Sequence, residues 1–112
     1  MYPHEYMVSQ VISAKKFMMN NYATVIRLDE ISDAACFSRF HFIRLFKKFY
    51  GITPNQFLAE LRIAKAKEFL KQGKSVSETC FMVGFDSETT FAALFKKTVG
   101  RSPSKFKKSN IQ

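Results

Sequence analysis

The sequence predicts an all-α protein of about seven helices, in which two helix-turn-helix subdomains are joined by a long linker helix. Apolar residues recur at helical spacing along most of the chain, no segment alternates as a half-buried strand would, and one sequence unit occurs twice. The predicted subdomains cover residues 1–52 and 74–112, and the linker helix covers residues 53–73.

The repeat is clearest where residues 42–57 read FIRLFKKFYGITPNQF and residues 91–106 read FAALFKKTVGRSPSKF. At a constant offset the two stretches share Phe, Leu, Phe, Lys-Lys, Gly, Pro and Phe. Upstream, one extra residue enters the second copy, after which Phe37 matches Phe85 and Leu28 matches Val76. The same unit of about 30 residues therefore occurs twice.

The first copy predicts two helices separated by a short turn over residues 36–38. The first of these helices is short and has one apolar face, formed by Leu28, Ile31 and Ala35. Ser38 is placed to cap the second helix, which covers about residues 39–50, and Gly51 is placed to end it. The buried stripe of the second helix consists of Phe42, Leu45, Phe46 and Phe49.

The second copy predicts the same arrangement. Ser75 and Glu78 have the spacing of a capping box, and Gly84 is placed to end the helix that they open. Ser87 is placed to cap the next helix, which ends before Gly100. Its inward positions are Phe91, Leu94, Phe95 and Thr98. The N-cap and N1 pair Ser102 and Pro103 predicts a last short helix, which ends near Lys108.

Two further helices complete the prediction. An amphipathic first helix covers residues 9–22, and its apolar positions are Val8, Val11, Ile12, Met18 and Tyr22. Thr53 and Pro54 open the linker helix, which runs to about Gln72 before a stop at Gly73. The apolar positions of the linker helix are Phe57, Leu58, Leu61, Ala64 and Leu70.

The charge balance indicates an anionic partner. The 112 residues include 18 Lys and Arg against 9 Asp and Glu, which gives a net charge of +9 and a pI near 9.8. Such an excess is typical of proteins that bind nucleic acid or an anionic membrane. A membrane-surface role needs a free apolar face, and the apolar faces here are expected to be used by the core.

Catalysis is not predicted, and neither is a cofactor or a metal. The sequence shows no nucleophile–base arrangement, phosphate loop or zinc-ligand spacing, and Cys36 and His41 form an isolated pair. Cys36 and Cys80 are expected to be small buried groups. No apolar run has the length of a signal peptide or of a membrane span, so we expect a cytoplasmic location.

A helix-turn-helix unit places its second helix in the major groove of DNA. A step of roughly 100° per residue puts Phe40, Arg44 and Lys47 opposite the buried stripe, with Ile43 on its flank. Arg44 suits a bidentate contact with guanine, and the outward apolar groups of Phe40 and Ile43 suit thymine methyl groups. The alternative for Phe40 is that it packs back onto the preceding helix as core.

The equivalent face of the second copy has fewer groups that can read bases. Its positions hold Thr89, Ala93 and Lys96, with Ala92 on the flank. Alanine can touch a methyl group but cannot donate a hydrogen bond. Glu88 either accepts from cytosine N4 or complements the helix dipole. We therefore expect the second copy to contribute affinity and positioning more than specificity.

Phosphate contacts are expected from cations and helix starts. Residues 96–108 include six basic and no acidic residues, and the Lys-Lys pairs recur at equivalent places. A solvated surface charge is the alternative for any single lysine. Helix starts at Thr53 and Ser102 also offer backbone N–H groups. The full expected set is Ser38, Lys47, Lys48, Thr53, Ser87, Lys96, Lys97, Arg101, Ser102 and Lys105.

The predicted linker helix suggests a spacing between the two reading helices. About 18 residues at a rise of 1.5 Å give a rod of roughly 27 Å. Successive major-groove segments on one side of DNA lie about 34 Å apart. One chain is therefore expected to read two consecutive segments of an asymmetric site.

Two stretches, FSRFHFIRLFKKFYGITPNQFLAELRIAKAKEFL and VGFDSETTFAALFKKTVGRSPSKF, resemble the DNA-binding domain of the AraC/XylS family of bacterial transcription regulators. The second has the family's signature of Gly-Phe, Phe, Phe-Lys-Lys, Gly and Ser-Pro, and with the first helix the resemblance covers essentially the whole chain. It implies seven helices and bacterial promoter DNA as the target. It also implies base-reading or flanking positions at Arg39, Phe40, Ile43, Arg44, Glu88, Thr89, Ala92 and Ala93.

The chain departs from the family pattern at a few positions. Ala92 and Ala93 stand where many members have Ser or Thr followed by Arg, which argues against strong base reading by the second copy. Ser32 and Cys80 stand where the bracing helices usually have a small Ala. Most members also have an N-terminal sensor or dimerisation domain, so the chain is either a stand-alone member or the C-terminal part of a longer protein.

The sequence thus predicts a sequence-specific, double-stranded DNA-binding transcription regulator. The alternative is a sequence-tolerant architectural DNA-binding protein, for which a reading face with few polar groups would be normal. A third class is an interaction module that contacts RNA polymerase or another regulator, and this role is compatible with DNA binding.

Overall fold

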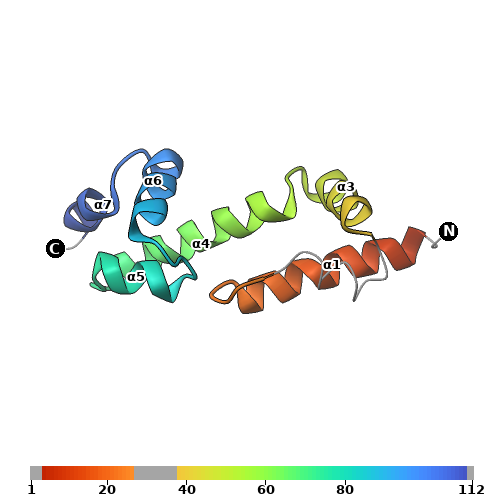
Figure 1. Cartoon of the computed structure of the whole chain (residues 1–112), viewed down its shortest axis with the longest axis horizontal. Helices are drawn as coiled ribbons and strands as arrows, with labels where there is room; N and C mark the ends of the chain where they lie inside the picture. The colour runs from red at the N-terminus through yellow and green to blue at the C-terminus, as the bar shows by residue number, and fades with distance from the viewer. Residues whose placement is uncertain (1–3, 27–37, 111–112) are drawn as a thin grey trace. The chain divides into compact units, whose positions relative to one another are not determined.

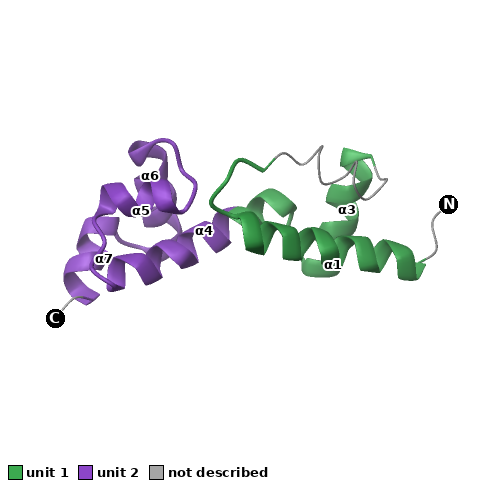
Figure 2. Ribbon diagram, turned by 90° about the horizontal axis from the view of Figure 1, so that it is seen from below, with its two compact units in different colours: residues 1–58 green, residues 59–112 purple. Residues whose placement is uncertain are grey.

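The computed structural model describes residues 4–26 and 38–110, and within them it contains six helices and no strand (Figure 1). The all-α prediction is confirmed, although the expected count of about seven helices is slightly high for these residues. The helix expected around Leu28, the turn around Cys36 and the position of Ser32 lie outside the described residues. The chain divides into two compact units, Met1–Leu58 and Ala59–Gln112 (Figure 2).

The core of the first unit forms where α1, His4–Asn21, packs against α3, Arg39–Tyr50. The buried residues are Val11, Ala14 and Met18 on α1 and Phe42, Leu45 and Phe46 on α3. The expectation that Ile12 faces this core is wrong, because its side chain is 42% exposed. One residue turns a helix by about 100°, which moves Ile12 off the face that Val11 occupies.

The ends of α3 are set by local chemistry. The Ser38 side chain accepts a hydrogen bond from the His41 N–H at 3.1 Å, so the predicted N-cap is confirmed. At the other end Gly51 has φ 81°, and its N–H donates to the Lys47 carbonyl oxygen at 2.8 Å. A side chain at this left-handed position would be strained, which explains why the helix ends at a glycine.

Helix α4, Pro54–Lys71, begins in the first unit and continues into the second. Its start is a reciprocal capping box, because the Gln56 N–H donates to Thr53 Oγ1 at 3.2 Å and the Thr53 N–H donates to Gln56 Oε1 at 2.9 Å. In the second unit its buried residues are Ile63, Ala66 and Leu70. The prediction that Ala64 is a core position is wrong, because it is exposed about 120° around the helix from this stripe.

The second unit adds three helices to this part of α4: α5, Val76–Met82; α6, Glu88–Val99; and α7, Pro103–Asn110. Helix α6 packs against both α5 and α7. The three predicted serine caps are confirmed, since Ser75, Ser87 and Ser102 accept hydrogen bonds from the N–H groups of Glu78, Thr90 and Lys105, respectively. Gly84 and Gly100 have positive φ at the predicted helix ends.

One predicted core residue in the last turn of each of α3 and α6 is exposed, contrary to prediction. Phe49 is 37% exposed, and its ring centroid lies 6.0 Å from that of His4 at the first residue of α1. Thr98, the equivalent residue of α6, is also exposed. Both residues lie on the angular stripe that the helix buries elsewhere. Helical periodicity alone therefore does not decide whether a position on this stripe is buried.

The two cores repeat the same aromatic contacts. The ring centroids of Phe42 and Phe46 lie 5.9 Å apart, and those of Phe91 and Phe95 lie 5.7 Å apart. Each chain of rings continues to the first turns of the next helix, with 5.8 Å between Phe46 and Phe57 and 5.5 Å between Phe95 and Phe106. The repeat seen in the sequence is therefore a repeat of packing.

The repeat also includes the helix before each copy, which the sequence comparison did not detect. The buried residues Val11, Ala14 and Met18 of α1 have the same spacing as Ile63, Ala66 and Leu70 of α4. The same offset pairs Lys15 with Lys67. Lys15 Nζ lies 5.5 Å from the Phe57 ring centroid, and Lys67 Nζ lies 5.9 Å from that of Phe106. Helices α1 and α4 thus hold equivalent places in the two units.

Candidate nucleic-acid interface

Helix α3 exposes the face that the sequence assigned to base reading. Phe40 is 70% exposed and is not part of the described core, whereas the preceding helix on which the alternative would pack it lies outside the described residues. Arg44 and Lys47 are also exposed, and Ile43 is half-buried between this face and the core. This face therefore presents a large apolar ring, a guanidinium and an ammonium group side by side.

Arg39 and Phe40 form one surface at the start of α3. The guanidinium carbon of Arg39 lies 5.5 Å from the centroid of the Phe40 ring, within the range of a cation–π contact. The guanidinium of Arg39 therefore already contacts the Phe40 ring. The family resemblance, by contrast, implies that Arg39 lies among the base-reading positions. The pair brings a positive charge and an apolar ring edge to the same end of the helix.

Helix α6 exposes small side chains at the equivalent places. Glu88, Thr89, Ala93 and Lys96 are exposed, and Ala92 is half-buried. Glu88 is the first residue of the helix, where a carboxylate complements the helix dipole. Both roles that the sequence allowed for Glu88 remain open at this position.

The hydroxyl groups expected to contact phosphate already act as helix caps. The side-chain oxygens of Ser38, Thr53, Ser87 and Ser102 each accept a backbone N–H three residues further along the chain. Each hydroxyl proton can still be donated to an anion. The backbone N–H of Thr53 is different, because it donates to Gln56 and is not available to a phosphate.

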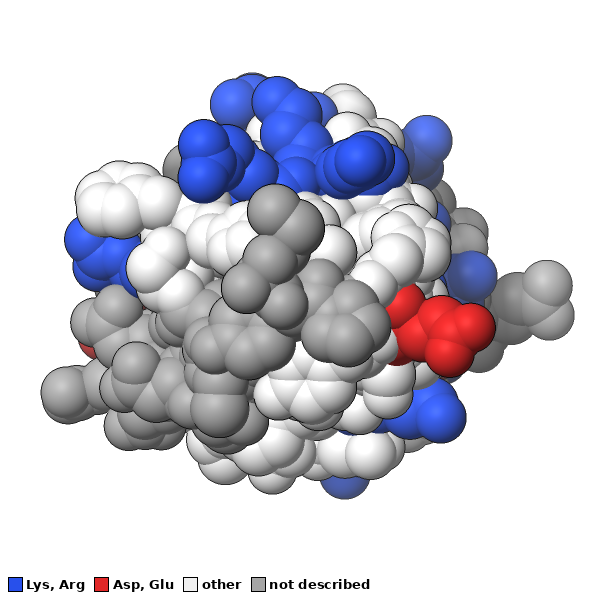
Figure 3. All heavy atoms as spheres, turned by 90° about the vertical axis from the view of Figure 1, so that its right-hand side faces the viewer, with Lys and Arg blue, Asp and Glu red and all other residues white. Residues whose placement is uncertain are grey.

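The expected phosphate-binding cations lie near the helix ends. Lys47 and Lys48 lie in the last turn of α3, and Lys96 and Lys97 lie in the last turn of α6. All four side chains are exposed. Arg101 is exposed, and its Nη1 donates to Ser109 Oγ at 2.8 Å, which fixes the side chain against α7. On the face drawn in Figure 3, Lys and Arg side chains gather along one edge. A cation at a helix C-terminus also stabilises the helix dipole, so these positions have a structural role as well.

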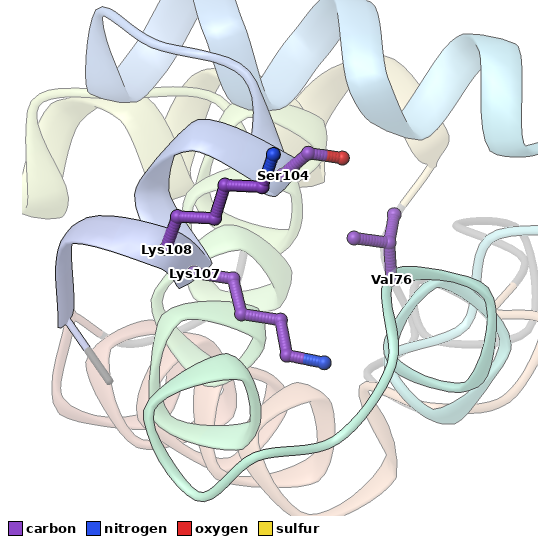
Figure 4. Close-up of a pocket in the computed structure, with 4 residues that line it drawn as sticks. All are labelled: Val76, Ser104, Lys107 and Lys108. Carbon is purple, nitrogen blue, oxygen red and sulfur yellow. The ribbon is translucent and has the colours of Figure 1, made fainter. Parts of the chain in front are cut away.

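Two further lysines of α7 were not among the predicted phosphate contacts. Lys107 and Lys108 line a hollow between α5 and α7, together with Val76 and Ser104 (Figure 4). Lys105 projects about 160° around the helix from Lys107, so the two side chains leave nearly opposite sides of α7. The signal for Lys107 and Lys108 was the basic run over residues 96–108, which we used only in part.

The described residues offer little for other kinds of site. No group of three His, Cys, Asp or Glu side chains within residues 4–26 and 38–110 is placed to hold a metal ion. In the same ranges no helix is long and apolar enough to cross a bilayer. Cys80 is buried, and burial raises the pKa of its thiol, with Glu88 and Asp86 adding to the rise. A raised pKa keeps the less reactive thiol form at neutral pH.

Comparison with known proteins supports a helix-turn-helix domain. Residues 31–109 match the model of a helix-turn-helix domain family. The chain is 35% identical over 99 residues to an uncharacterized HTH-type transcriptional regulator of Pseudoalteromonas carrageenovora, which covers 88% of this chain and 59% of the relative. The chain spans only 28% and 27% of the length of two other relatives.

Solved structures give the same fold. A transcriptional regulator of Chromobacterium violaceum, described as AraC-type, matches with a TM-score of 0.81 and 25% identity over 91% of this chain and 92% of that one. The DNA-binding domain of AdpA, a global transcriptional factor solved in complex with a target DNA, matches with a TM-score of 0.84 and 23% identity over 88% and 90% of the two chains. At that level of identity the second likeness concerns the fold alone.

Proposed function

The chain belongs to the AraC/XylS family of helix-turn-helix transcription regulators and is a DNA-binding domain of that family. We propose that its helices α3 and α6 bind two consecutive major-groove segments of double-stranded DNA. In this proposal the two helix-turn-helix subdomains cover residues 1–52 and 74–112, and residues 53–73 link them. The target is an asymmetric site in promoter DNA, because the two reading faces differ.

The single observation that carries the proposal is the exposed face of α3. Phe40, at 70% exposure, stands beside Arg44 and Lys47 on the side of the helix opposite its buried aromatic residues. Phe40 and Ile43 would meet thymine methyl groups, and Arg44 would bind guanine O6 and N7. A base edge in the major groove can contact the apolar ring through a methyl group and the guanidinium through hydrogen bonds.

Helix α6 has a different part in the proposal. Thr89 and Glu88 are its polar candidates for base contacts, and Ala92 and Ala93 contribute only methyl contacts. Its neighbours Lys96, Lys97, Arg101 and Lys105 neutralise backbone phosphates, as Lys47 and Lys48 do after α3. The first unit therefore supplies most of the sequence preference, and the second supplies mainly affinity and register.

Two further roles extend the proposal beyond the DNA contact itself. We propose that an N-terminal sensor or dimerisation domain, and contact with RNA polymerase, regulate what the bound domain does at a promoter. DNA as the target also places the protein in the cytoplasm in this proposal. A sequence-tolerant architectural protein is the competing function, and the few polar groups on the α6 face are the observation that favours it.

Selection of bound duplexes from a random pool at physiological salt tests the proposal. We expect one asymmetric site with two boxes about one helical turn apart, bound at least a thousandfold better than random DNA. A single short box would show that α6 only clamps the backbone. A pool with no enriched sequence would favour the architectural function.

A second experiment isolates the role of Phe40. Replacing thymine with deoxyuridine in the selected site removes the methyl group and leaves the hydrogen-bonding edge unchanged. We expect weaker binding at one or two positions, and we expect Phe40→Ala to abolish this difference. Equal binding of thymine and uracil sites would remove methyl reading from the proposal.

A further inference from the structure

The turn before α6 is covered by a cation from α4. The guanidinium carbon of Arg62 lies 5.8 Å from the ring centroid of Phe85, and both residues are half-buried. Phe85 lies two residues before Ser87, the N-cap of α6. Burial lowers the pKa of the Arg62 guanidinium from its ordinary value, as expected for a cation removed from water.

Phe85 in turn connects α5 to α6. Its N–H donates to the Cys80 carbonyl oxygen at 3.1 Å, and the preceding Gly84 has φ 99°. Its ring centroid lies 5.3 Å from that of Phe91, which is fully buried in the second turn of α6. An apolar contact between the residues before an N-cap and the second helical turn fixes the angle at which the chain enters the helix.

We propose that Arg62 is a positioning residue for DNA reading by α6. It acts through Phe85: the guanidinium covers the exposed side of the ring, the ring packs on Phe91, and the start of α6 is held in one place. This inference rests on the proposed function, because it assigns the placement of a reading helix to a residue that need not touch DNA.

At the matching position of α1, the first unit has no cation. The offset that pairs Lys15 with Lys67 pairs Arg62 with Gln10, a neutral residue of α1. This difference between Arg62 and Gln10 agrees with the different side chains on the reading faces of α6 and α3. Arg44 has a long side chain that can adapt to small shifts of its helix, whereas Ala92 and Ala93 can make only short-range contacts. A gap of about 0.5–1 Å already loses a quarter to a half of such an attraction, so α6 depends more on exact placement.

Two substitutions of Arg62 and one control test the inference. Arg62→Gln introduces the residue found at the equivalent place of the first unit, and Arg62→Lys keeps the charge without the planar guanidinium. Lys67→Gln is the matched control, because Lys67 is also an α4 cation over a ring, but that ring is Phe106 of α7. Each variant is measured against the selected site, against sites altered in either box, and by amide hydrogen exchange without DNA.

We expect Arg62→Gln to weaken binding to the selected site by about three- to tenfold, the scale of one partly buried cation–π contact. Discrimination should fall in the box read by α6 and stay unchanged in the box read by α3. Amides of residues 84–90 should exchange faster, and Arg62→Lys should lie between Arg62→Gln and the wild type. Lys67→Gln should leave base discrimination unchanged.

Equal loss of discrimination in both boxes, or faster exchange throughout the second unit, would show a merely structural role and overturn the inference. Unchanged exchange at residues 84–90 would overturn it as well. Should the wild-type domain enrich no sequence, the proposed function fails, whereas the exchange measurement without DNA still decides whether Arg62 holds the turn.

Discussion

In the first unit α3 exposes Phe40, Arg44 and Lys47, whereas at the equivalent positions of the second unit α6 exposes Thr89, Ala93 and Lys96. The side chains on the opposite, buried faces of the two helices are nearly the same. Phe42 and Phe46 of α3 correspond to Phe91 and Phe95 of α6, and all four rings are fully buried.

The difference between the two faces separates constraints of folding from constraints of binding. Close packing penalises any change of shape in the core, so both units keep the same aromatic residues at the same spacing. The outer face is free of that constraint, and here two residues of three differ in size and chemistry. The matched last-turn lysines remain in both units, as expected for contacts with a backbone that is the same at every site.

The largest expected effect comes from breaking the shared core. Phe46→Ala and Phe95→Ala should each lower the free energy of unfolding by about 3–5 kcal/mol, because each removes a fully buried ring. Denaturant unfolding followed by amide signals from both units measures the loss and its location. If one substitution cost less than about 1 kcal/mol, the two cores would not be energetically equivalent.

The next prediction concerns the reading faces. Arg44→Ala should weaken binding to the selected site by about 1–3 kcal/mol and relax preference at one base position. Ala93→Arg places the same side chain at the equivalent position of α6 and should add preference for guanine in the second box. Competition binding with singly altered duplexes measures both changes. An equal loss on random DNA would show that Arg44 contacts only the backbone.

Helix termination should cost the same in both units. Gly51→Ala and Gly100→Ala should each destabilise the domain by about 1–2 kcal/mol, because φ is 81° and 95° at these positions. No atom lies within 4 Å of a Cβ added at either glycine, so the cost is strain in the backbone and not a clash. Thermal unfolding of the two variants checks this, and a stabilised variant would contradict it.

A smaller effect is expected for the paired lysines. Lys48→Ala and Lys97→Ala should each weaken all duplexes alike and lower the slope of log affinity against log salt by about one unit. The slope is measured by titration over a series of salt concentrations. An unchanged slope for either variant would remove that lysine from the phosphate contacts.

The smallest expected effect is a gain of stability in the second unit. Thr79 is fully buried, and among the described residues its Oγ1 has no hydrogen-bond partner. The matching position of the first copy is the apolar Ile31. Thr79→Val removes the unsatisfied hydroxyl at nearly constant volume and should stabilise the domain by about 1 kcal/mol or less. A loss of stability in chemical denaturation would indicate that the hydroxyl is satisfied by water.

The sequence was most informative where structure depends on neighbouring residues. The caps at Ser38, Ser75 and Ser87 and the stops at Gly51 and Gly100 lie where they were predicted, because each requires one residue type in one local conformation. Reading-face exposure on α3 and α6 could also be derived, since it follows from helical rotation once the buried stripe is known.

Sequence patterns failed where burial depends on a distant partner. Phe49 and Thr98 lie on the apolar stripe but are exposed, and Ala64 is an apolar residue on an exposed face of α4. The equivalence of α1 and α4 was hidden because few positions besides the buried ones match. Arg62 was not recognised for a similar reason: its contact, Phe85, is far away in sequence, and its charge alone suggests a solvent-exposed residue. The DNA contacts themselves remain predictions.

In the proposed complex, the unlike faces of α3 and α6 also give the domain a direction on DNA. A symmetric dimer on a palindromic site looks the same from both ends of the duplex, so its binding does not distinguish upstream from downstream. A chain with a guanidinium and a phenyl ring on one reading helix and two alanines on the other fits its site in one orientation only. In that complex the same end of the domain always faces the same end of the site, at a fixed polarity relative to the gene.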